Sequence, residues 1–407
     1  MEKKTQTVRT SWSGRRRHTD RAGRNDGAFS RRTSGSGQRR CNIMDLPDDV
    51  LYDIFRFLSP ESLCRVSQVC RRFLMLASED TVWLQYERER TVLRLQNSRS
   101  LYGLKERYRV ALNWESGHRW ETWLLRYGSR MLPWLQREDN TLWMSVGNVI
   151  RKFSLQDNGI RLREHTEGRL QGLHSDATRF VIKNGLCVSG CRKGNLSAWE
   201  TSSGMQLLHY SKIHNSDTQC VDVVDDMIVS GSKDKTAKVV SMLHDDEERI
   251  RKCFNIGDRV WSLSVSPNKS TLAVGTACYN YPPIFLWDLN SGQLLNHLGA
   301  DFKRGSGVLD MAFESPNTLL TCGHDTYLRM WDLRTQTCVN MWEDQFDSAV
   351  YCLKTDGLYT MLTGTARHGL AYYSRHQTSP VYSMASDVHR LFLALDVGLN
   401  MMDFSIR

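Results

Sequence analysis

Apolar and polar side chains alternate in a series of short segments through the second half of the chain. The clearest example is residues 327–331, where the alternation has the period of a half-buried β-strand. The four residues before it, 323–326, read Gly-His-Asp-Thr, and Gly and Asp favour tight turns. The pattern therefore predicts a strand that follows a turn.

Similar segments recur along the chain, and their spacing predicts the fold. Successive copies end 31 to 47 residues apart. Periods of roughly 40–45 residues are typical of four-stranded propeller blades, whose apolar faces must be covered by neighbouring blades in a closed ring. We therefore predict a mainly β fold, a seven-bladed β-propeller. The copies end at Phe153, Trp199, Val240, Trp287, Trp331, Tyr373 and Phe404.

A different pattern precedes the repeats, with apolar residues at helical spacing in residues 44–88. Ser59, Pro60 and Glu61 form the typical start of a helix. Residues 78–80 begin another helix, so we expect three short helices in all. A module of this size rarely builds a sufficient core alone, which indicates that a partner completes it.

Two further segments connect this helical module to the repeats. Residues 91–113 keep a helical pattern, and residues 120–127 are strand-like. Because the last repeat copy ends close to the C-terminus, its sheet lacks one strand, and we predict that residues 120–127 supply it and close the ring. The expected organisation is a basic tail (1–41), a three-helix module (42–90), a helical linker (91–118) and a propeller (119–407).

The positive charge of the chain is concentrated in the tail. Residues 1–40 hold twelve Lys or Arg and three acidic residues, which accounts for the net charge of +9; the other residues hold 42 basic and 42 acidic residues, from totals of 54 and 45. The tail contains almost no apolar residues, so we expect it to be disordered. Its short Arg runs are compatible with a nuclear localisation signal or an RNA-binding arm. A solvated tail is the favoured interpretation, and nucleic-acid binding is not expected.

The remaining composition restricts the function. Eleven cysteines, without a Cys-x-x-Cys pair, fit buried thiols in a reducing compartment, so we expect a soluble protein of the cytoplasm, the nucleus or both. No segment has the length and apolarity of a membrane span or of a signal peptide. Phosphate-binding, serine-hydrolase and zinc-protease motifs are absent, and we expect no metal and no cofactor. Residues 234–236 read Asp-Lys-Thr, which we interpret as a repeat turn.

The repeats resemble the WD-repeat family. Trp287-Asp288 and Trp331-Asp332 match its signature dipeptide, and His214, Ser230 and Asp234 match its polar residues in one copy. In the family these three side chains bond to a Trp indole, and here Val240 stands in its place. The resemblance therefore implies a copy of normal shape that lacks the hydrogen-bond network.

In the helical module, Leu46-Pro47, the ridge of Leu51, Ile54 and Leu58, and the segment Val69-Cys70-Arg71-Arg72-Phe73 resemble an F-box. The chain from Met44 onward is similar to F-box/WD-repeat proteins. This resemblance implies a non-enzymatic substrate receptor that binds a Skp-type adaptor and, through it, the cullin and RING subunits of a ubiquitin ligase. The alternative is a WD-repeat scaffold or RNA-associated protein that acts through the basic tail. The expected adaptor contacts are Leu46, Pro47, Leu51, Ile54, Leu58, Leu63 and Val69.

The resemblance also implies where a target protein binds, since propeller adaptors hold peptides over one end of the central channel. Aligned repeats place Thr178, Gln219, Trp261, Leu309, Tyr351 and Tyr382 in one column. Relatives that read phosphorylated motifs have Arg at this position, whereas no copy has it here. We expect Trp261, Tyr351 and Tyr382, with Gln219, to hold an apolar segment, unless these rings only pack between blades. The basic pairs Arg192-Lys193 and Lys233/Lys235 are expected to hold an acidic or phosphorylated segment at the edge.

Overall fold

The structure is a computed structural model that describes residues 42–87, 103–138, 140–155, 162–243, 249–280, 282–344, 347–355, 361–366 and 379–406. The predicted tail (1–41), residues 91–102 of the predicted linker (91–118) and the end of the repeat copy at Tyr373 lie outside the described residues. The chain divides into two units, residues 1–51 and 52–407.

The described part of the first unit begins with a 3-10 turn, Ile43–Asp45. Asn42 caps this turn: its side-chain oxygen accepts a hydrogen bond from the Met44 amide (3.1 Å), and Asp45 accepts one from the Asn42 amide (3.3 Å). Helix α1 (Asp48–Phe55) follows and continues into the second unit. Reciprocal capping of this kind fixes the start of the helical module.

The helices of the second unit differ from the prediction in one respect. Ser59 caps α2 (Pro60–Val66) as expected. The predicted second helix, however, is divided into α2 and α3 (Arg71–Leu76). Cys70 causes the division because its backbone is extended (φ −156°, ψ 167°) and its Sγ accepts from the Phe73 amide at 3.4 Å, which makes it the N-cap of a new helix.

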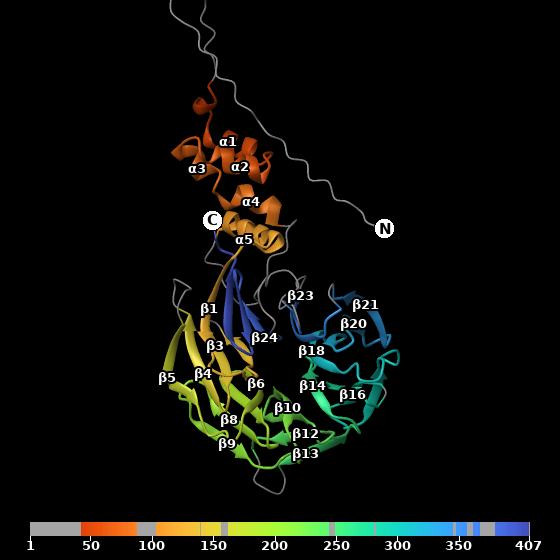
Figure 1. The fold of residues 1–407 in the computed structure, drawn as a ribbon. Helices are drawn as coiled ribbons and strands as arrows, with labels where there is room; N and C mark the ends of the chain where they lie inside the picture. Colours follow the sequence, from red (N-terminus) through yellow and green to blue (C-terminus); the bar gives the residue numbers. More distant parts are fainter. Residues whose placement is uncertain are drawn as a thin grey trace, which may run out of the picture. The chain divides into compact units, whose positions relative to one another are not determined.

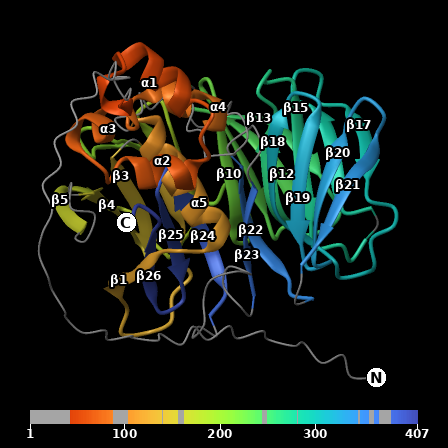
Figure 2. The same ribbon diagram turned by 90° about the horizontal axis from the view of Figure 1, so that it is seen from above.

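Two more helices complete this part: α4 (Asp80–Glu87) and α5 (Leu104–Ser116). The Leu104 amide at the start of α5 donates to the Asp80 carboxylate (2.7 Å), and the Trp83 and Tyr108 rings lie 5.4 Å apart. These contacts hold α5 against α4. Figure 2 shows α5 beside the sheet that contains β24, β25 and β26.

The rest of the second unit is a ring of antiparallel sheets (Figure 1). From the centre outward, the first three four-stranded sheets are β2 (Leu135–Glu138), β3 (Thr141–Val146), β4 (Val149–Leu155), β5 (Leu162–Leu170); β6 (Ala177–Lys183), β7 (Leu186–Cys191), β8 (Leu196–Glu200), β9 (Gln206–Tyr210); and β10 (Thr218–Val224), β11 (Met227–Ser232), β12 (Thr236–Ser241), β13 (Ile250–Asn255). The next two are β14 (Val260–Val265), β15 (Thr271–Thr276), β16 (Ile284–Asp288), β17 (Leu294–Leu298); and β18 (Val308–Ser315), β19 (Thr318–Gly323), β20 (Tyr327–Asp332), β21 (Thr337–Glu343). The last two sheets are β22 (Val350–Thr355), β23 (Met361–Thr365); and β24 (Val381–Ser386), β25 (Arg390–Leu395), β26 (Gly398–Asp403), β1 (Trp120–Arg126).

The first strands of these sheets contact one another in a closed ring, β2, β6, β10, β14, β18, β22, β24 and back to β2. Six blades have four strands in the described residues, against the seven predicted; the sheet β22–β23 has two, and residues 367–378 after it lie outside the described part. In the six four-stranded sheets, the repeat pattern of the sequence marks the third strand rather than the inner strand.

The predicted closing strand is confirmed. Strand β1 pairs antiparallel with β26, with Trp120 opposite Asp403 and Arg126 opposite Gly398. The last blade therefore combines one strand from before the first repeat with three from the end of the chain. This pairing covers a sheet edge that would otherwise be open.

The hydrogen-bond network around His214 is present, contrary to the expectation that it would be missing. His214 lies within hydrogen-bond distance of Asp234 (3.0 Å), Thr236 (3.1 Å) and Ser230 (2.9 Å), so the network forms although Val240 replaces the tryptophan. The polar groups satisfy one another, and buried Val240 only fills space. Burial raises the pKa of Asp234, but hydrogen bonds from His214 and Thr236 outweigh burial and hold that pKa well below its usual value.

Candidate functional site

The inner strands share an irregularity at one level of the channel. In β6, β10, β14, β18, β22 and β24 the pairing register shifts by one residue near the start of the strand, which is a β-bulge. Bulges redirect side chains and are common beside functional sites. The residues skipped by the register are Thr178 with Arg179, Gln219, Trp261, Leu309, Tyr351 and Tyr382.

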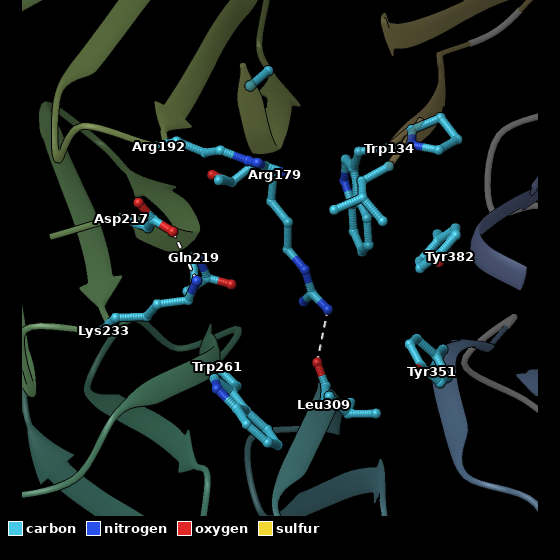
Figure 3. A pocket seen from close by; sticks show the side chains of 14 residues that line it. Trp134, Arg179, Arg192, Asp217, Gln219, Lys233, Trp261, Leu309, Tyr351 and Tyr382 are labelled. Atoms are coloured by element: carbon cyan, nitrogen blue, oxygen red, sulfur yellow. Dashed lines mark hydrogen bonds and ion pairs between the residues drawn. The ribbon is translucent and has the colours of Figure 1, made fainter. Parts of the chain in front are cut away.

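These residues line a single cavity of about 360 Å³, which we call the aromatic mouth (Figure 3). The column aligned from the sequence is therefore one level of the channel. Trp134, which precedes β2, adds a fourth large ring to those of the column. The aromatic mouth is lined by Leu132, Pro133, Trp134, Ala177, Thr178, Arg179, Arg192, Asp217, Gln219, Lys233, Trp261, Leu309, Tyr351 and Tyr382.

The rings of the aromatic mouth contact one another, and each of them remains partly exposed. Tyr351 and Tyr382 meet edge to face at 5.7 Å, and His324 lies between Trp261 (5.4 Å) and Tyr351 (6.1 Å). Trp261, Tyr351 and Tyr382 are all half-buried. Burial raises the pKa of Tyr382, so its phenol is neutral at physiological pH. The rings therefore offer apolar surface and neutral hydroxyl groups to the cavity.

The basic residues predicted at the edge divide into two groups. Arg192 and Lys233 line the aromatic mouth, whereas Lys193 and Lys235 do not. Lys233 lies 2.7 Å from Asp217, and Arg192 lies 3.9 Å from Asp176. The two of these cations that line the cavity, Arg192 and Lys233, thus have carboxylate neighbours.

Arg179 is a central residue of the cavity that the sequence alignment missed. Figure 3 shows its side chain reaching across the channel toward Leu309. Its guanidinium donates to the Leu309 carbonyl (2.7 Å) and to Asp310 (3.0 Å), and it lies 4.2 Å over the Trp134 ring. The alignment placed Thr178 in the column, but the bulge in β6 includes the next residue as well.

Helices of the second unit carry uncovered apolar side chains. Of the predicted adaptor contacts here, Val69 is 67% and Ile54 38% exposed, Leu58 is half-buried, and Leu63 is fully buried in the fold. Phe57, which the sequence analysis did not select, is 91% exposed. Helix α1 ends at Phe55, so Phe57 lies beyond its last turn. The helical spacing used to choose the adaptor contacts therefore does not include Phe57.

In the first unit, the three predicted adaptor contacts differ in exposure. Pro47 is exposed, Leu46 is half-buried, and Leu51 is fully buried. Leu51 is held in α1 by a hydrogen bond from its amide to the Pro47 carbonyl (3.1 Å). Pro47 and Leu46 therefore present surface, while Leu51 supports the helix.

The described ranges hold neither a metal-binding cluster nor a membrane-spanning helix. Those residues contain no group of three or more His, Cys, Asp or Glu side chains placed to hold a metal ion. The helices that the structure describes include none with the length and apolarity to cross a membrane.

Comparison with known proteins shows similarity along almost the whole chain. The F-box-like family matches residues 43–88, and the family "WD domain, G-beta repeat" matches residues 293–332. F-box/WD repeat-containing protein 4 of Homo sapiens is 36% identical over 88% of this chain and 92% of the human protein. The Mus musculus protein of the same name is also 36% identical, with the same coverage.

More distant similarities follow. The F-box/WD-40 repeat-containing protein At5g21040 of Arabidopsis thaliana is 24% identical over 72% of this chain and 56% of that protein. The crystal structure of the computationally designed Ika8 protein matches 69% of this chain and 98% of that one, with a TM-score of 0.50 and 18% identity, which shows a likeness of fold alone.

Proposed function

Since this chain belongs to the F-box/WD repeat-containing protein 4 family, and is thus an F-box protein of the substrate-receptor type, we propose that it serves a Skp–cullin–F-box ubiquitin ligase. The F-box binds the Skp-type adaptor, and the propeller binds the protein to be ubiquitinated and degraded. The cullin and RING partners supply the ubiquitin chemistry, so this chain acts as a non-catalytic receptor.

The observation that carries the adaptor half of the proposal is the exposed apolar surface of the second-unit helices. Ile54, Phe57 and Val69 leave large apolar side chains uncovered by their own chain. Exposed patches of this kind mark protein–protein contacts. Ile54, Leu58 and Val69 are the proposed contacts there, and Leu63, which is fully buried in α2, supports the fold.

Co-precipitation of adaptor and cullin with the full chain tests this half. The variant Ile54→Asp with Val69→Asp should lose both partners, because truncating or charging a central anchor of an interface costs ~2 kcal/mol or more. Leu84→Asp, at an exposed site on α4 (52%), is the matched control and should bind as wild type. Wild-type recovery of the adaptor by the double variant would refute the docking surface.

A separate variant tests the first unit. Leu46→Ala with Pro47→Ala removes the two predicted contacts that the structure leaves partly or fully exposed. We expect reduced co-precipitation of adaptor and cullin. Unchanged recovery would remove Leu46 and Pro47 from the proposed interface without affecting the test of the second-unit helices.

The target half of the proposal rests on the aromatic mouth. Large half-buried rings face a concave cavity, and the cations lining it have carboxylate neighbours, so the site suits an apolar or aromatic segment more than a phosphate. Tyr and Trp bury large areas at low entropic cost. We propose Trp261, Tyr351 and Tyr382 as the principal target contacts.

Affinity purification with the ligase inhibited tests the target half. Tyr351→Ala with Tyr382→Ala should abolish capture of the targets that the wild-type chain retains. Charge reversal at Lys233 and Lys235 should only weaken it, because Lys233 is already paired with Asp217 and Lys235 lies outside the cavity lining. Full loss on charge reversal, with full capture by the folded Tyr variant, would contradict the proposal.

A further inference from the structure

The charged side chains that line the aromatic mouth already have partners in the protein. Arg179 pairs with Asp310 (3.0 Å), and Lys233 pairs with Asp217 (2.7 Å). The third lining cation, Arg192, is exposed and lies 3.9 Å from a carboxylate. A charged ligand would have to compete with these carboxylates or with these cations. The charges of the lining therefore do not define what the cavity binds.

The neutral polar groups of the lining are in a different state. Five neutral side chains make no hydrogen bond among the residues that the structure describes, and all five are half-buried. They are the indole groups of Trp134 and Trp261, the hydroxyl groups of Tyr351 and Tyr382, and the amide of Gln219. Half-buried polar groups without a partner favour a ligand that supplies one.

Donors predominate among these five groups. An indole N–H only donates, whereas a tyrosine hydroxyl and a glutamine amide both donate and accept. The strongest acceptors of the lining are already used, because the Asp217 carboxylate accepts from Lys233 (2.7 Å) and the Leu309 carbonyl accepts from Arg179 (2.7 Å). The cavity therefore matches a neutral ligand that is rich in acceptor oxygens and poor in N–H groups.

The rings set flat apolar surface beside these donors. Tyr351 and Tyr382 meet at 88°, so that the face of one ring and the edge of the other form a corner. Figure 3 shows Gln219 on one side of the Arg179 side chain and the two tyrosines on the other. Aromatic faces next to N–H and O–H donors are the arrangement that proline-rich segments use in aromatic-lined grooves.

We propose that the aromatic mouth binds a proline-rich segment in the polyproline II conformation. A prolyl residue offers a carbonyl oxygen but no N–H, and the polyproline II helix has no internal hydrogen bonds, so its carbonyls are open to donors. Any other residue brings an N–H that would lose water in the cavity, where few acceptors are open. The conformation of such a segment is also set before binding, which lowers the entropic cost.

This inference rests on the proposed role of the aromatic mouth in target binding and names the class of target. The cavity, of about 360 Å³, lies within the usual volume range of binding pockets, roughly 300–1,000 Å³. It therefore suits a few residues of a longer chain. The targets are proteins that expose a proline-rich segment.

Fluorescence anisotropy with the purified full chain tests the inference. The probe is a labelled octaproline, N-acetylated and C-amidated, and the control peptide is a capped octamer of alternating leucine and glutamine. Octaproline should bind saturably and about tenfold more tightly than the control, because the control brings N–H groups that the cavity leaves unpaired. Its affinity should not change as salt is raised, since neutral groups make the contacts. No saturable binding of octaproline, or equal binding of the control, would overturn the inference.

Conservative variants give the second readout. Trp261→Phe keeps an aromatic ring but removes the N–H, so octaproline should bind about fivefold more weakly. Tyr351→Phe removes only a hydroxyl group and should have a similar effect. Trp342→Phe, on the outer strand β21 and outside the cavity lining, is the matched control and should bind as wild type. Wild-type affinity of both Trp261→Phe and Tyr351→Phe would overturn the inference.

The peptide assay uses the chain alone, so its result is separate from that of the ligase experiments. Target capture that depends on Tyr351 and Tyr382, in a chain that does not bind octaproline, would overturn this inference and leave the proposed function intact. Octaproline binding by a chain that captures no target would support this inference and contradict the target half of the proposed function.

Discussion

Trp114 in helix α5 stacks on Phe404 near the end of the chain, with ring centroids 3.7 Å apart and an angle of 15° between the planes. Beside this stack, the Asn113 side chain donates to the carbonyls of Phe404 (2.8 Å) and Ile406 (2.9 Å). Phe404 is fully buried. The helix that contacts α4 is thereby fixed to the blade that closes the propeller, so α4, α5 and this blade are mechanically continuous.

The first prediction concerns this stack. Trp114→Ala should lower the free energy of unfolding by about 3 kcal/mol, because it removes a large aromatic contact and leaves a cavity over Phe404. Urea unfolding measures the change. Leu112→Ala, on an exposed part of α5 (41%), is the control and should change stability by less than about 1 kcal/mol. Equal effects of the two variants would show that the stack does not stabilise the fold.

The second prediction concerns closure of the ring. Removing residues 1–128 deletes α5 and β1 and leaves the edge of β26 unpaired. Open sheet edges pair with other chains, so this truncation should aggregate and melt at a lower temperature. Removing residues 1–41 alone is the control and should leave both properties unchanged. A monomeric 129–407 chain with wild-type melting would contradict the role assigned to β1.

The third prediction concerns the bridge between Arg179 and Asp310, whose side chains are 19% and 12% exposed. Arg179→Met should destabilise the propeller by roughly 3 kcal/mol, because it leaves a largely buried carboxylate without its cation. Asp310→Asn keeps an oxygen for the Leu353 amide. The double variant should therefore be more stable than the sum of the single effects predicts. Strict additivity in a double-mutant cycle would show that the two residues are not coupled.

The fourth prediction is a pH dependence. The pKa of Asp234 is held below its usual value by its hydrogen bonds to His214 and Thr236, after burial has acted in the opposite direction. A carboxyl group whose pKa is lower in the folded than in the unfolded state stabilises the fold. This stabilisation is fully present above the unfolded-state pKa, about 3.9, and is lost as pH falls from that value toward the folded-state pKa. The stability difference between wild type and Asp234→Asn should thus be constant from pH 7 to about pH 5 and shrink in more acidic solution. Unfolding by urea at each pH measures this, and a pH-independent difference would contradict it.

Much of the fold follows from the sequence because it depends on patterns within single segments. The period near 40 residues identifies the blades, and the unpaired last copy at Phe404 indicates a strand from elsewhere, which β1 supplies. The aligned column from Gln219 to Tyr382 predicts one level of the channel, because equivalent positions in repeated strands must occupy equivalent places in a ring. The polar network at His214 was expected to be lost with the tryptophan, yet its members satisfy one another locally.

Other features were decided only by tertiary structure. The division of the helix at Cys70 depends on the backbone conformation of that residue. Leu63 is buried and Phe57 is exposed because of the way the helices pack, which the periodicity of the sequence does not specify. A bulge in β6 turns Arg179 into the channel, where it meets Asp310, a residue 131 positions away. Long-range closure brings such residues together, and no local pattern encodes which distant charges will meet.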